Sequence, residues 1–419
     1  MEEMLHRWNP WWEEGKVPPD RLGTARPRYL NALTAQLRER RVTVVSGPRR
    51  TGKTTLVFQT INALIDAGTS PDRILYAQLD HPGIDMDIGA IIREFRKLQG
   101  IPAKERIFIF LDEVQYAKDW ARWAKTIFDM DEGKLFITGS TTALLETDAF
   151  ASLTGRWTKI PVWPLDLEEF ILFRNGKVTG ADRYLESSHL REYMRTGGFP
   201  EAVLEKEEHA RTDFLVDLFD DMIFKDAARS RNIRDPGSLR RVAVFLMGAI
   251  GKPGSVNKMQ RTFKLSANTI SSYIDALCNA YLFFPCPYFS RSVNERIYNP
   301  RKYYAIDPGM AHAVLGHQGS GAAVENLLAL HYHKSGPVSY WKSEAELDFV
   351  IGNARGVLES KFKGSIEPKE LRGGLSFCKR HRIKRLFVAT DDLEEERDIA
   401  GIDVLFVPAT RILLGKGGP

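Results

Sequence analysis

The sequence predicts an α/β protein with more than one domain, and three observations support this class. Short apolar strands alternate with helical segments over residues 26–165, a pattern typical of a parallel sheet covered by helices. A glycine-bounded loop joins the first of these strands to a helix. Near the C-terminus, two strands flank a turn and indicate a second α/β unit. At 419 residues, the chain is also too long for one ordinary domain.

Composition narrows the class of protein. Hydrophobic residues make up 43% of the chain, which is enough for globular cores, and a net charge of +5 does not by itself demand a nucleic-acid partner. The three cysteines lack the spacing of a zinc site and favour a reducing compartment. The acidic start is unlike a signal peptide, and the longest apolar run, 242–250, is too short to cross a bilayer. We therefore expect a cytoplasmic protein without a membrane partner.

Residues 1–25 form an N-terminal arm that contains Asn9-Pro-Trp-Trp12. Two adjacent tryptophans need to be buried, because each carries a large apolar surface. The arm either docks on the domain that follows or anchors a partner, and the sequence leaves both alternatives open. A helix over 28–40 is predicted next, from apolar residues at helical spacing.

The first strand, 42–46, leads into a loop with the G-x-x-x-x-G-K-[ST] pattern that binds phosphate. Its glycines let backbone N–H groups point at a triphosphate, and a helix that begins near Lys53 directs its positive end at the same phosphates. We expect Lys53 to contact the β- and γ-phosphates of ATP and the Thr54 hydroxyl to bind Mg²⁺. The predicted nucleotide-binding residues of this loop are Gly47, Pro48, Arg49, Arg50, Thr51, Gly52, Lys53, Thr54 and Thr55.

A second apolar strand, 107–111, ends in the two carboxylates Asp112 and Glu113. We expect Asp112 to complete the Mg²⁺ shell and bind nucleotide, and Glu113 to polarise the attacking water. The alternative is a buried strand that ends in a solvated acidic pair. The phosphate-binding loop upstream favours ATP hydrolysis.

The remaining predicted strands, 74–79, 135–138 and 158–162, complete a sheet whose ligands should gather at the strand carboxyl ends. Polar side chains follow three of these ends: Asp80, the Asp112–Glu113 pair, and Ser140 with Thr141. Ser140 and its neighbour either sense the γ-phosphate or cap the next helix. Arg156 is an arginine-finger candidate, in cis or from a neighbouring subunit, or else an ordinary surface arginine. The nucleotide-binding domain would span residues 26–165.

Residues 166–240 are predicted to be helical, broken at Gly197-Gly-Phe-Pro200, and would form a lid on this domain. Residues 241–290 fit a winged helix-turn-helix. Helices over 239–250, from 256 and over 267–280, the last capped by Ser266, would be followed by strands that pair as a wing.

The third of these helices offers base-contacting polar side chains but no Lys or Arg, so phosphate contacts would fall to Lys252, Lys258, Arg261 and Lys264. DNA contact and a protein-docking or structural role both stay open.

Residues 291–419 form the second α/β domain, in which a helix over 323–331 precedes a hairpin. Strands 346–352 and 357–361 around a turn at 353–356 would place Asp348 opposite Lys361, with Glu359 on the same face. Two carboxylates can hold Mg²⁺, and a lysine can orient or activate the water that attacks a phosphodiester. The alternative is a solvated cross-strand ion pair.

Basic residues dominate the stretch that follows. From Lys361 to Arg385 there are nine basic residues against two acidic ones. Such a block suits a phosphate backbone, and a solvated face is the alternative.

The hairpin residues resemble the PD-(D/E)xK nuclease superfamily, in which Glu325, on the preceding helix, matches the position of a further acidic ligand. Nearly the whole chain resembles prokaryotic AAA-type ATPases that carry a C-terminal restriction-endonuclease-like domain of largely unknown role. The matching segments are Asn9-Pro-Trp-Trp12, Gly47–Thr55, Leu111-Asp-Glu-Val-Gln115, Thr138-Gly-Ser140, Leu153-Thr-Gly-Arg156, Pro164-Leu165, Gly197-Gly-Phe-Pro-Glu201, Glu346–Val350 and Glu359-Ser-Lys361. The resemblance implies ATP binding and, through the intact hairpin, nuclease activity.

The leading hypothesis is an ATP-hydrolysing protein that binds duplex or structured DNA. Its C-terminal Mg²⁺-dependent nuclease-like domain would be gated by the nucleotide state, and a homo-oligomer would allow an arginine finger to act between copies. The rival hypothesis is an ATP-dependent switch or scaffold whose C-terminal domain binds nucleic acid or protein without cutting.

Overall fold

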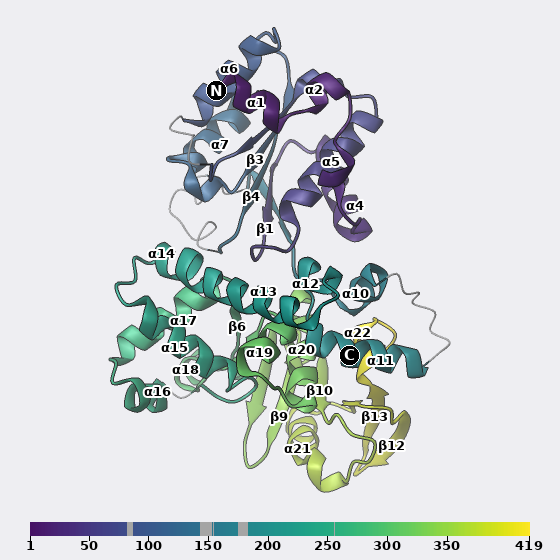
Figure 1. Ribbon diagram of the computed structural model, residues 1–419. Helices are drawn as coiled ribbons and strands as arrows, with labels where there is room; N and C mark the ends of the chain where they lie inside the picture. The colour runs from purple at the N-terminus through teal and green to yellow at the C-terminus, as the bar shows by residue number, and fades with distance from the viewer. Residues whose placement is uncertain (82–86, 143–152, 154, 175–182, 255) are drawn as a thin grey trace. The chain divides into compact units, whose positions relative to one another are not determined.

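The computed structural model describes residues 1–81, 87–142, 153, 155–174, 183–254 and 256–419. The chain divides into two compact units, Met1–Trp163 and Pro164–Pro419, each of which has its own sheet (Figure 1). The boundary lies close to the predicted end of the nucleotide-binding domain at 165. Among the described residues, no helix is long and apolar enough to cross a membrane.

The first unit is a five-stranded parallel sheet in the order β2-β3-β4-β1-β5, with helices on both sides (Figure 1). Its strands are β1 (Val42–Ser46), β2 (Ile74–Gln78), β3 (Ile107–Asp112), β4 (Gly133–Gly139) and β5 (Trp157–Pro161). Its larger helices are α4 (Pro27–Ala35), α5 (Lys53–Asp66), α6 (Ile88–Leu98) and α7 (Trp120–Asp129). Every residue of β1 and β4 is buried, which confirms a sheet covered on both faces.

The strand order determines which loops meet. Strand β4 lies between β1 and β3, and all three strands run in the same direction. The segments after their carboxyl ends are the phosphate-binding loop, the Asp112–Glu113 pair and Ser140. Because parallel strands end at one edge of a sheet, these three segments come together there.

The N-terminal arm folds into α1 (Glu2–Trp8), α2 (Trp11–Glu14) and α3 (Pro19–Leu22) and docks on the edge strand β2. The amide of buried Asn9 donates a hydrogen bond to the carbonyl of Tyr76 (2.9 Å) and accepts one from its N–H (2.7 Å). The indole N–H groups of Trp11 and Trp12 both donate to the carbonyl of Ile74, over 3.3 and 2.9 Å. The arm therefore satisfies backbone groups that an edge strand would leave unpaired, and it docks on its own domain.

The second unit contains the helices predicted to form a lid. They are α10 (Leu167–Phe173), α11 (Arg183–Thr196), α12 (Pro200–Leu204), α13 (Glu208–Asp221), a π-helical turn (Met222–Ala227) and α14 (Ala228–Ser230). Helices α11 and α13 pack against α19 (Pro308–Leu315), which lies far along the chain. These helices therefore lie within the second unit, and their role as a lid on the nucleotide-binding domain stays a prediction.

A close approach of two turns explains the Gly197-Gly-Phe-Pro200 break. The buried carboxylate of Asp307 accepts hydrogen bonds from the N–H groups of Gly198 (2.6 Å) and Met310 (2.8 Å). Gly197 has a φ of +76°, and a Cβ there would lie 2.1 Å from Asp307 Oδ1. Burial raises the pKa of Asp307 to about 6. Glycine is required at this position because two backbone segments share one carboxylate.

Three helices and a hairpin follow in the order predicted for residues 241–290. They are α15 (Pro236–Met247), α16 (Val256–Phe263), α17 (Ala267–Asn279), β6 (Phe283–Cys286) and β7 (Lys302–Ala305). Ser266 caps α17, since its hydroxyl accepts a hydrogen bond from Thr269 N (3.1 Å). Strands β6 and β7 pair antiparallel, as expected for the wing, and α18 (Val293–Tyr298) lies in their connection. Membership of the winged-helix class stays a prediction.

The C-terminal part has a six-stranded mixed sheet in the order β12-β13-β11-β10-β9-β8. Its elements are α20 (Ser320–Ser335), β8 (Val338–Lys342), β9 (Glu346–Ile351), β10 (Gly356–Ser360), α21 (Arg372–His381), β11 (Arg385–Thr390), β12 (Glu395–Ile399), β13 (Ile402–Pro408) and α22 (Ala409–Leu413). Strands β8, β9 and β10 pair antiparallel, and β10 pairs in parallel with β11 through the α21 crossover. A second α/β sheet is present near the C-terminus, within a compact unit that begins at Pro164 and not at the predicted residue 291.

The predicted register of the β9–β10 hairpin is wrong by two positions. Gly356 pairs with Ile351 and Leu358 with Phe349, so Asp348 lies level with Glu359 and not with Lys361. The loop is the four-residue segment 352–355, in which Gly352, Asn353 and Ala354 all have positive φ. A shift by an even number of residues leaves every side chain on its predicted face. The clustering of the three site residues therefore survives the error.

Removing the Asn9 amide should destabilise the first unit. Asn9→Ala leaves the buried N–H and carbonyl of Tyr76 without their partners, and we expect a loss of about 2–3 kcal/mol in the free energy of unfolding. Denaturant unfolding with fluorescence detection measures it. Asn31→Ala, at an exposed position of α4, is the matched control and should change stability by less than about 0.5 kcal/mol. Equal stability of the two variants would contradict the role of the arm.

Candidate functional site

Lys53 is held inside the phosphate-binding loop by loop carbonyls. Its Nζ donates hydrogen bonds to the carbonyls of Gly47 (3.0 Å) and Pro48 (2.9 Å), and it lies 3.7 Å from Glu113 Oε1. Gly47 has no room for a side chain, because a Cβ there would lie 2.0 Å from the carbonyl oxygen of Val162. The loop is thus closely packed and carries its cation at the edge of the sheet where ligands gather.

The Asp112 carboxylate is buried and held by three hydroxyl groups from different elements. Thr54 donates to Oδ2 over 2.7 Å, Tyr76 donates to the same oxygen over 2.9 Å, and the Thr138 hydroxyl donates to Oδ1. Burial and the neighbouring Glu113 raise the pKa of Asp112. Paired hydroxyl and carboxylate oxygens fit Mg²⁺, which prefers hard oxygen ligands. Thr54 and Asp112 are therefore together, as predicted.

Glu113 is connected to Ser140 through a residue that the sequence analysis did not assign. The amide of Gln115 donates hydrogen bonds to the Glu113 carboxylate and to Ser140 Oγ, the latter over 3.1 Å. Glu113 has a left-handed φ of 53°, and its N–H donates to the Thr138 hydroxyl (2.9 Å). The water-polarising candidate and the phosphate-sensing candidate thus form one network. The alternative role of Ser140, capping the next helix, concerns residues outside the described ranges.

Other residues of the loop support its backbone. Thr51 is fully buried, and its hydroxyl donates to the carbonyl of Pro48 (2.9 Å). Buried Arg26 donates to the carbonyls of Thr51 and Trp163, each over 3.0 Å. Sequence reasoning missed Arg26 and Tyr76, because their contacts join segments that no local motif connects.

Arg156 does not lie beside the phosphate-binding loop of its own chain. It precedes β5, and its carbonyl accepts a hydrogen bond from Val42 N, at the first residue of β1 (2.9 Å). The loop follows the last residue of β1, so about 16 Å of strand separates the two sites. Arg156 Nε lies 3.4 Å from Asp129 Oδ1 at the end of α7. The geometry speaks against a finger in cis, and a role toward a neighbouring copy stays a prediction. Thr154 of the predicted motif lies outside the described residues.

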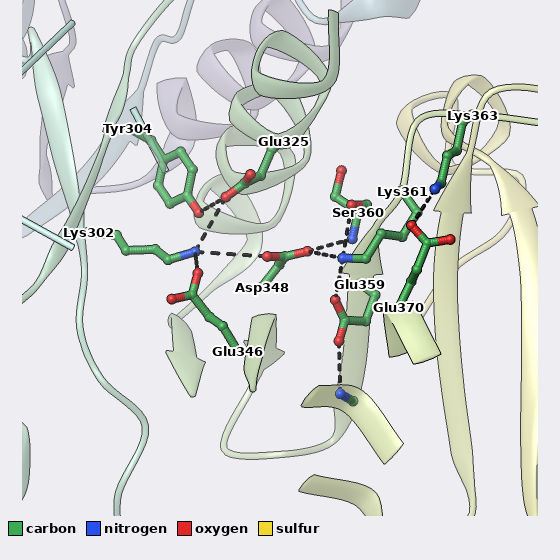
Figure 2. Close-up of polar contacts among 11 residues, drawn as sticks. Lys302, Tyr304, Glu325, Glu346, Asp348, Glu359, Ser360, Lys361, Lys363 and Glu370 are labelled. Atoms are coloured by element: carbon green, nitrogen blue, oxygen red, sulfur yellow. Dashed lines mark hydrogen bonds and ion pairs between the residues drawn. The ribbon is translucent and has the colours of Figure 1, made fainter. Parts of the chain in front are cut away.

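The second unit brings together the three predicted hairpin residues (Figure 2). Lys361 Nζ lies 2.7 Å from Glu359 Oε2 and 3.4 Å from Asp348 Oδ2. The N–H of Ser360 donates to Asp348 Oδ2 (2.8 Å), and the N–H of Gly374 in α21 donates to the other Glu359 oxygen (2.8 Å). Glu359 is fully buried, whereas a solvated cross-strand pair would be exposed. The alternative of a solvated ion pair is therefore wrong.

A buried lysine that the sequence analysis missed lies among the neighbouring carboxylates. Lys302 is 1% exposed, and its Nζ lies 2.6 Å from Glu346 Oε1, 3.5 Å from Glu325 Oε1 and 3.9 Å from Asp348 Oδ1 (Figure 2). Tyr304 OH donates to Glu325 Oε1 over 2.7 Å. Glu346 was identifiable in principle, because it lies two residues before Asp348 on the same face. Lys302 carries no sequence signal, since β7 is remote from the hairpin.

The cluster contains more negative than positive formal charge, with four carboxylates and two ammonium groups. Burial and the charge of Asp348 raise the pKa of Glu359 to about 8 and that of Glu325 to about 7. Burial disfavours the charged forms of Lys302 and Lys361, but the carboxylates outweigh it and raise both pKa values. Excess negative charge of this kind is balanced by bound protons or by a divalent cation.

The fit of a metal ion to this cluster depends on Lys302. Asp348, Glu359 and Glu325 offer hard oxygen ligands, yet the Lys302 ammonium already lies within 4 Å of two of them. Within the described ranges, no group of three or more His, Cys, Asp or Glu residues is arranged to hold a metal ion. The Lys302 ammonium lies beside Glu325 and the Lys361 ammonium lies between Asp348 and Glu359, so metal binding by these carboxylates stays a prediction.

A family model described as an AAA domain matches residues 39–171, the range that contains the phosphate-binding loop and the Asp112–Glu113 pair. Residues 39–171 therefore form an AAA-type domain. The parallel sheet and the Thr54–Asp112 contact are the structural basis of this domain. A second family model, described as a domain of unknown function (DUF8612), matches residues 187–320, which lie outside the AAA domain's sheet.

Curated relatives match this chain over most of its length. An uncharacterized protein of Haemophilus influenzae is 26% identical over 395 residues, which cover 91% of this chain and 97% of that protein. An uncharacterized protein of Methanocaldococcus jannaschii is 27% identical over 331 residues, 74% of this chain and 72% of that protein. The Walker-type ATPase PABY2304 of Pyrococcus abyssi is a similar solved structure, with a TM-score of 0.47 and 14% identity, covering 72% of this chain and 98% of that chain. These similarities do not bear on the chemistry of the second unit.

Replacing Glu359 with glutamine should remove a pH-dependent destabilisation. The pKa of Glu359 in the folded state, about 8, lies above its ordinary value of 4.5. Between pH 4.5 and about pH 8, the folded state therefore holds a proton on Glu359 that the unfolded state has lost. The free energy of unfolding of the parent therefore falls as the pH rises through this window. We expect the Tm of Glu359→Gln, minus the parent Tm, to increase from about pH 5 to about pH 8 in EDTA.

The matched control is Glu396→Gln, at an exposed position of β12, which should give a constant difference. Differential scanning fluorimetry across the pH range measures all three proteins. A pH-independent difference for Glu359→Gln would mean that this carboxyl titrates normally.

Proposed function

We propose that this protein is an ATP-hydrolysing AAA ATPase that binds DNA, with a nuclease-like site in its second unit that is gated by the nucleotide state. One observation carries the ATPase part. The Thr54 hydroxyl and the Asp112 carboxylate are in direct contact, next to the Lys53–Glu113 pair. These four side chains are the groups that nucleotide hydrolysis requires, and they lie at one edge of one sheet.

The residues of the AAA domain divide the work of ATP hydrolysis. Lys53 would exchange its loop carbonyls for the β- and γ-phosphate oxygens, while Thr54 and Asp112 would hold Mg²⁺, which neutralises phosphate charge. Glu113 would accept a proton from the attacking water. The water oxygen would then bond to the γ-phosphorus as the bond between the γ-phosphorus and the β–γ bridging oxygen breaks. ADP and phosphate are the products. Gln115, which donates hydrogen bonds to both Glu113 and Ser140, would hold these two side chains in position to face the γ-phosphate.

The hairpin cluster supports hydrolysis of a phosphodiester. Asp348 and Glu359 would hold Mg²⁺ or Mn²⁺, which would polarise the phosphate. Lys361, 2.7 Å from Glu359, would stabilise the hydroxide or the phosphate charge as water attacks phosphorus and the bond to the leaving sugar oxygen breaks.

DNA binding is supported by exposed cations on and around α21. Both acidic residues in the basic stretch are paired, Glu370 with Lys363 and Glu367 with Lys369. None of the ion pairs within the described ranges involves the six other exposed cations, Arg372, Lys379, Arg380, Arg382, Lys384 and Arg385. Unpaired cations in this density suit a phosphate backbone.

The Lys302 ammonium favours a second candidate function. It supplies part of the positive charge that a metal ion would otherwise bring to Glu325, Glu346 and Asp348. A cluster stabilised in this way can hold its shape without metal. The protein would then be an ATP-dependent switch or scaffold whose second unit binds nucleic acid or protein without cutting.

Two substitutions in the AAA domain should separate binding from hydrolysis. Lys53→Ala removes the cation that faces the phosphates, so ATP affinity should fall and turnover vanish. Glu113→Gln should keep ATP bound and lower turnover by at least about 100-fold, since it removes only the group that polarises water. Phosphate-release kinetics and fluorescent-nucleotide binding measure the two quantities. Lys118→Ala, at an exposed position near β3, is the control and should behave like the parent.

Mixing two inactive variants extends the same test to Arg156. If Arg156 acts on the nucleotide of a neighbouring copy, Arg156→Ala should lower turnover and keep ATP affinity. Mixing it with Lys53→Ala should then restore part of the activity. If Arg156→Ala alone hydrolyses ATP at the parental rate, Arg156 is an ordinary surface arginine. If Lys53→Ala does so, the assignment of the phosphate-binding loop is wrong.

The hairpin separates the two candidate functions. Asp348→Asn keeps the side-chain volume and removes a metal-binding charge, so any DNA cleavage should fall by at least about 100-fold. ATPase activity should persist, because Asp348 lies in the other unit. The assay uses linear, branched and single-stranded DNA with Mg²⁺ or Mn²⁺, with and without ATP, and Asp392→Asn, exposed, is the control.

Two outcomes decide between the candidates. Clean, salt-sensitive DNA binding by the parent without cleavage under any of these conditions would favour the switch. Cleavage that survives Asp348→Asn would mean a contaminant or a different site.

A further inference from the structure

A pocket of about 390 Å³ lies within the second unit, where three segments distant in sequence meet. The connection between β6 and β7, the turn between β9 and β10, and the end of α21 each contribute. The lining residues are Phe289, Ser290, Arg291, Arg296, Asn353, Ala354, His381 and Ile383. Neither the AAA site nor the hairpin cluster uses any of them.

The pocket is cationic. Arg291 and Arg296 are exposed, and the ion pairs within the described ranges include neither of them. The nearby carboxylate of Glu295 accepts a hydrogen bond from Ser290 Oγ (2.6 Å), and its backbone N–H is capped by Ser292. The two guanidinium groups therefore have their donors available to a ligand.

His381 forms a rigid wall of this pocket. Its ring lies 4.2 Å from the ring of Phe377 and 5.6 Å from that of Phe289, measured between centroids. Burial, together with the charges of Arg380 and Arg291, lowers the pKa of His381. The ring thus experiences the positive potential of the surrounding arginines, which an anion would relieve.

We propose that this pocket binds a phosphate group of a nucleic-acid strand. Two guanidinium groups recognise a phosphate through charge-assisted hydrogen bonds, and the Asn353 amide adds a neutral donor. The apolar faces of Phe289 and Ile383 suit the sugar or base attached to that phosphate. The volume is at the small end of ligand pockets, as expected for one nucleotide unit and not for a larger ligand.

The surroundings of the pocket favour a strand over a free nucleotide. The exposed cations Lys379, Arg380 and Arg382 flank His381 and extend the positive surface beyond the pocket. Asp348 lies three residues before the end of β9, about 10 Å along the strand, and Asn353 follows in the turn. A strand held at the pocket therefore has further cations to follow, and the same hairpin connects the pocket to the carboxylate cluster. This proposal rests on the DNA binding proposed above.

The first arm of the test uses inorganic phosphate and needs no DNA. Phosphate titrated into the full-length protein should shift the NMR signals of the His381 ring in a saturable way, with Phe377 and Phe289 holding the ring in place. The signals are assigned by their loss in His381→Gln. The double variant Arg291→Ala/Arg296→Ala should lose the shift. Retained shifts in the double variant, or none in the parent, would overturn the proposal.

The second arm measures DNA affinity against salt concentration. Loss of one phosphate contact should reduce the slope of log affinity against log salt by about 0.7 for single strands or about 0.9 for duplex. We expect this reduction in Arg291→Ala/Arg296→Ala, with an unchanged Tm. The control is Arg355→Ala, exposed in the same β9–β10 turn but outside the lining, which should keep the parental slope.

The two arms distinguish failure of the pocket from failure of DNA binding. A phosphate shift in the parent together with a reduced slope in the double variant supports the proposal. Parental DNA binding with an unchanged slope in the double variant overturns the pocket as a strand contact and leaves DNA binding intact. A parent that binds phosphate and mononucleotide at His381 but no DNA overturns the proposed DNA binding, and the strand assignment with it.

Discussion

The carboxylate of Asp112 is the point on which the AAA domain depends. It is buried, and hydroxyl groups from α5, β2 and β4 hold it in place. An unpaired buried carboxylate would cost several kcal/mol or take up a proton, so these three contacts keep it ready for a cation. One of the three, from Tyr76, lies on an edge strand that the N-terminal arm supports. The arm thus contributes to the nucleotide site, because Asn9 holds the backbone of Tyr76.

The second unit also contains buried carboxylates, but lysine side chains and not hydroxyl groups stabilise them. Its four carboxylates have two lysines as partners, and Lys302 reaches them from a strand outside the hairpin. Burial and the charge of Asp348 raise the pKa values of Glu325 and Glu359 despite the two ammonium groups. The same electrostatics that would attract a divalent cation also allow the cluster to exist without one. For this reason the ATPase chemistry follows more directly from geometry than the nuclease chemistry does.

Features that depend on residues close together along the chain were predicted from the sequence, whereas features that depend on distant residues were not. The phosphate-binding loop, the strand before it and the acidic pair were correctly located, because each is specified within a few consecutive residues. The hairpin register was wrong by two positions, because three successive residues with positive φ closed a loop that the residue types do not specify uniquely. Its clustered face was nonetheless right, since side chains alternate with a period of two. The sequence left the role of Arg156 open, and the structure places its backbone beside the first residue of β1, away from the phosphate-binding loop that follows the last.

The sequence by itself determines three local features of this chain. They are a glycine-bounded loop that suits phosphate, an apolar strand that ends in carboxylates, and a hairpin whose side chains alternate between two faces. Those features depend on backbone conformation and on neighbours close along the chain. The partners of Asp112, the buried ammonium of Lys302 and the cationic pocket around His381 depend on segments brought together from far apart. No local pattern records such pairs, because burial and long-range packing select them only when the complete sheet and its covering helices are formed.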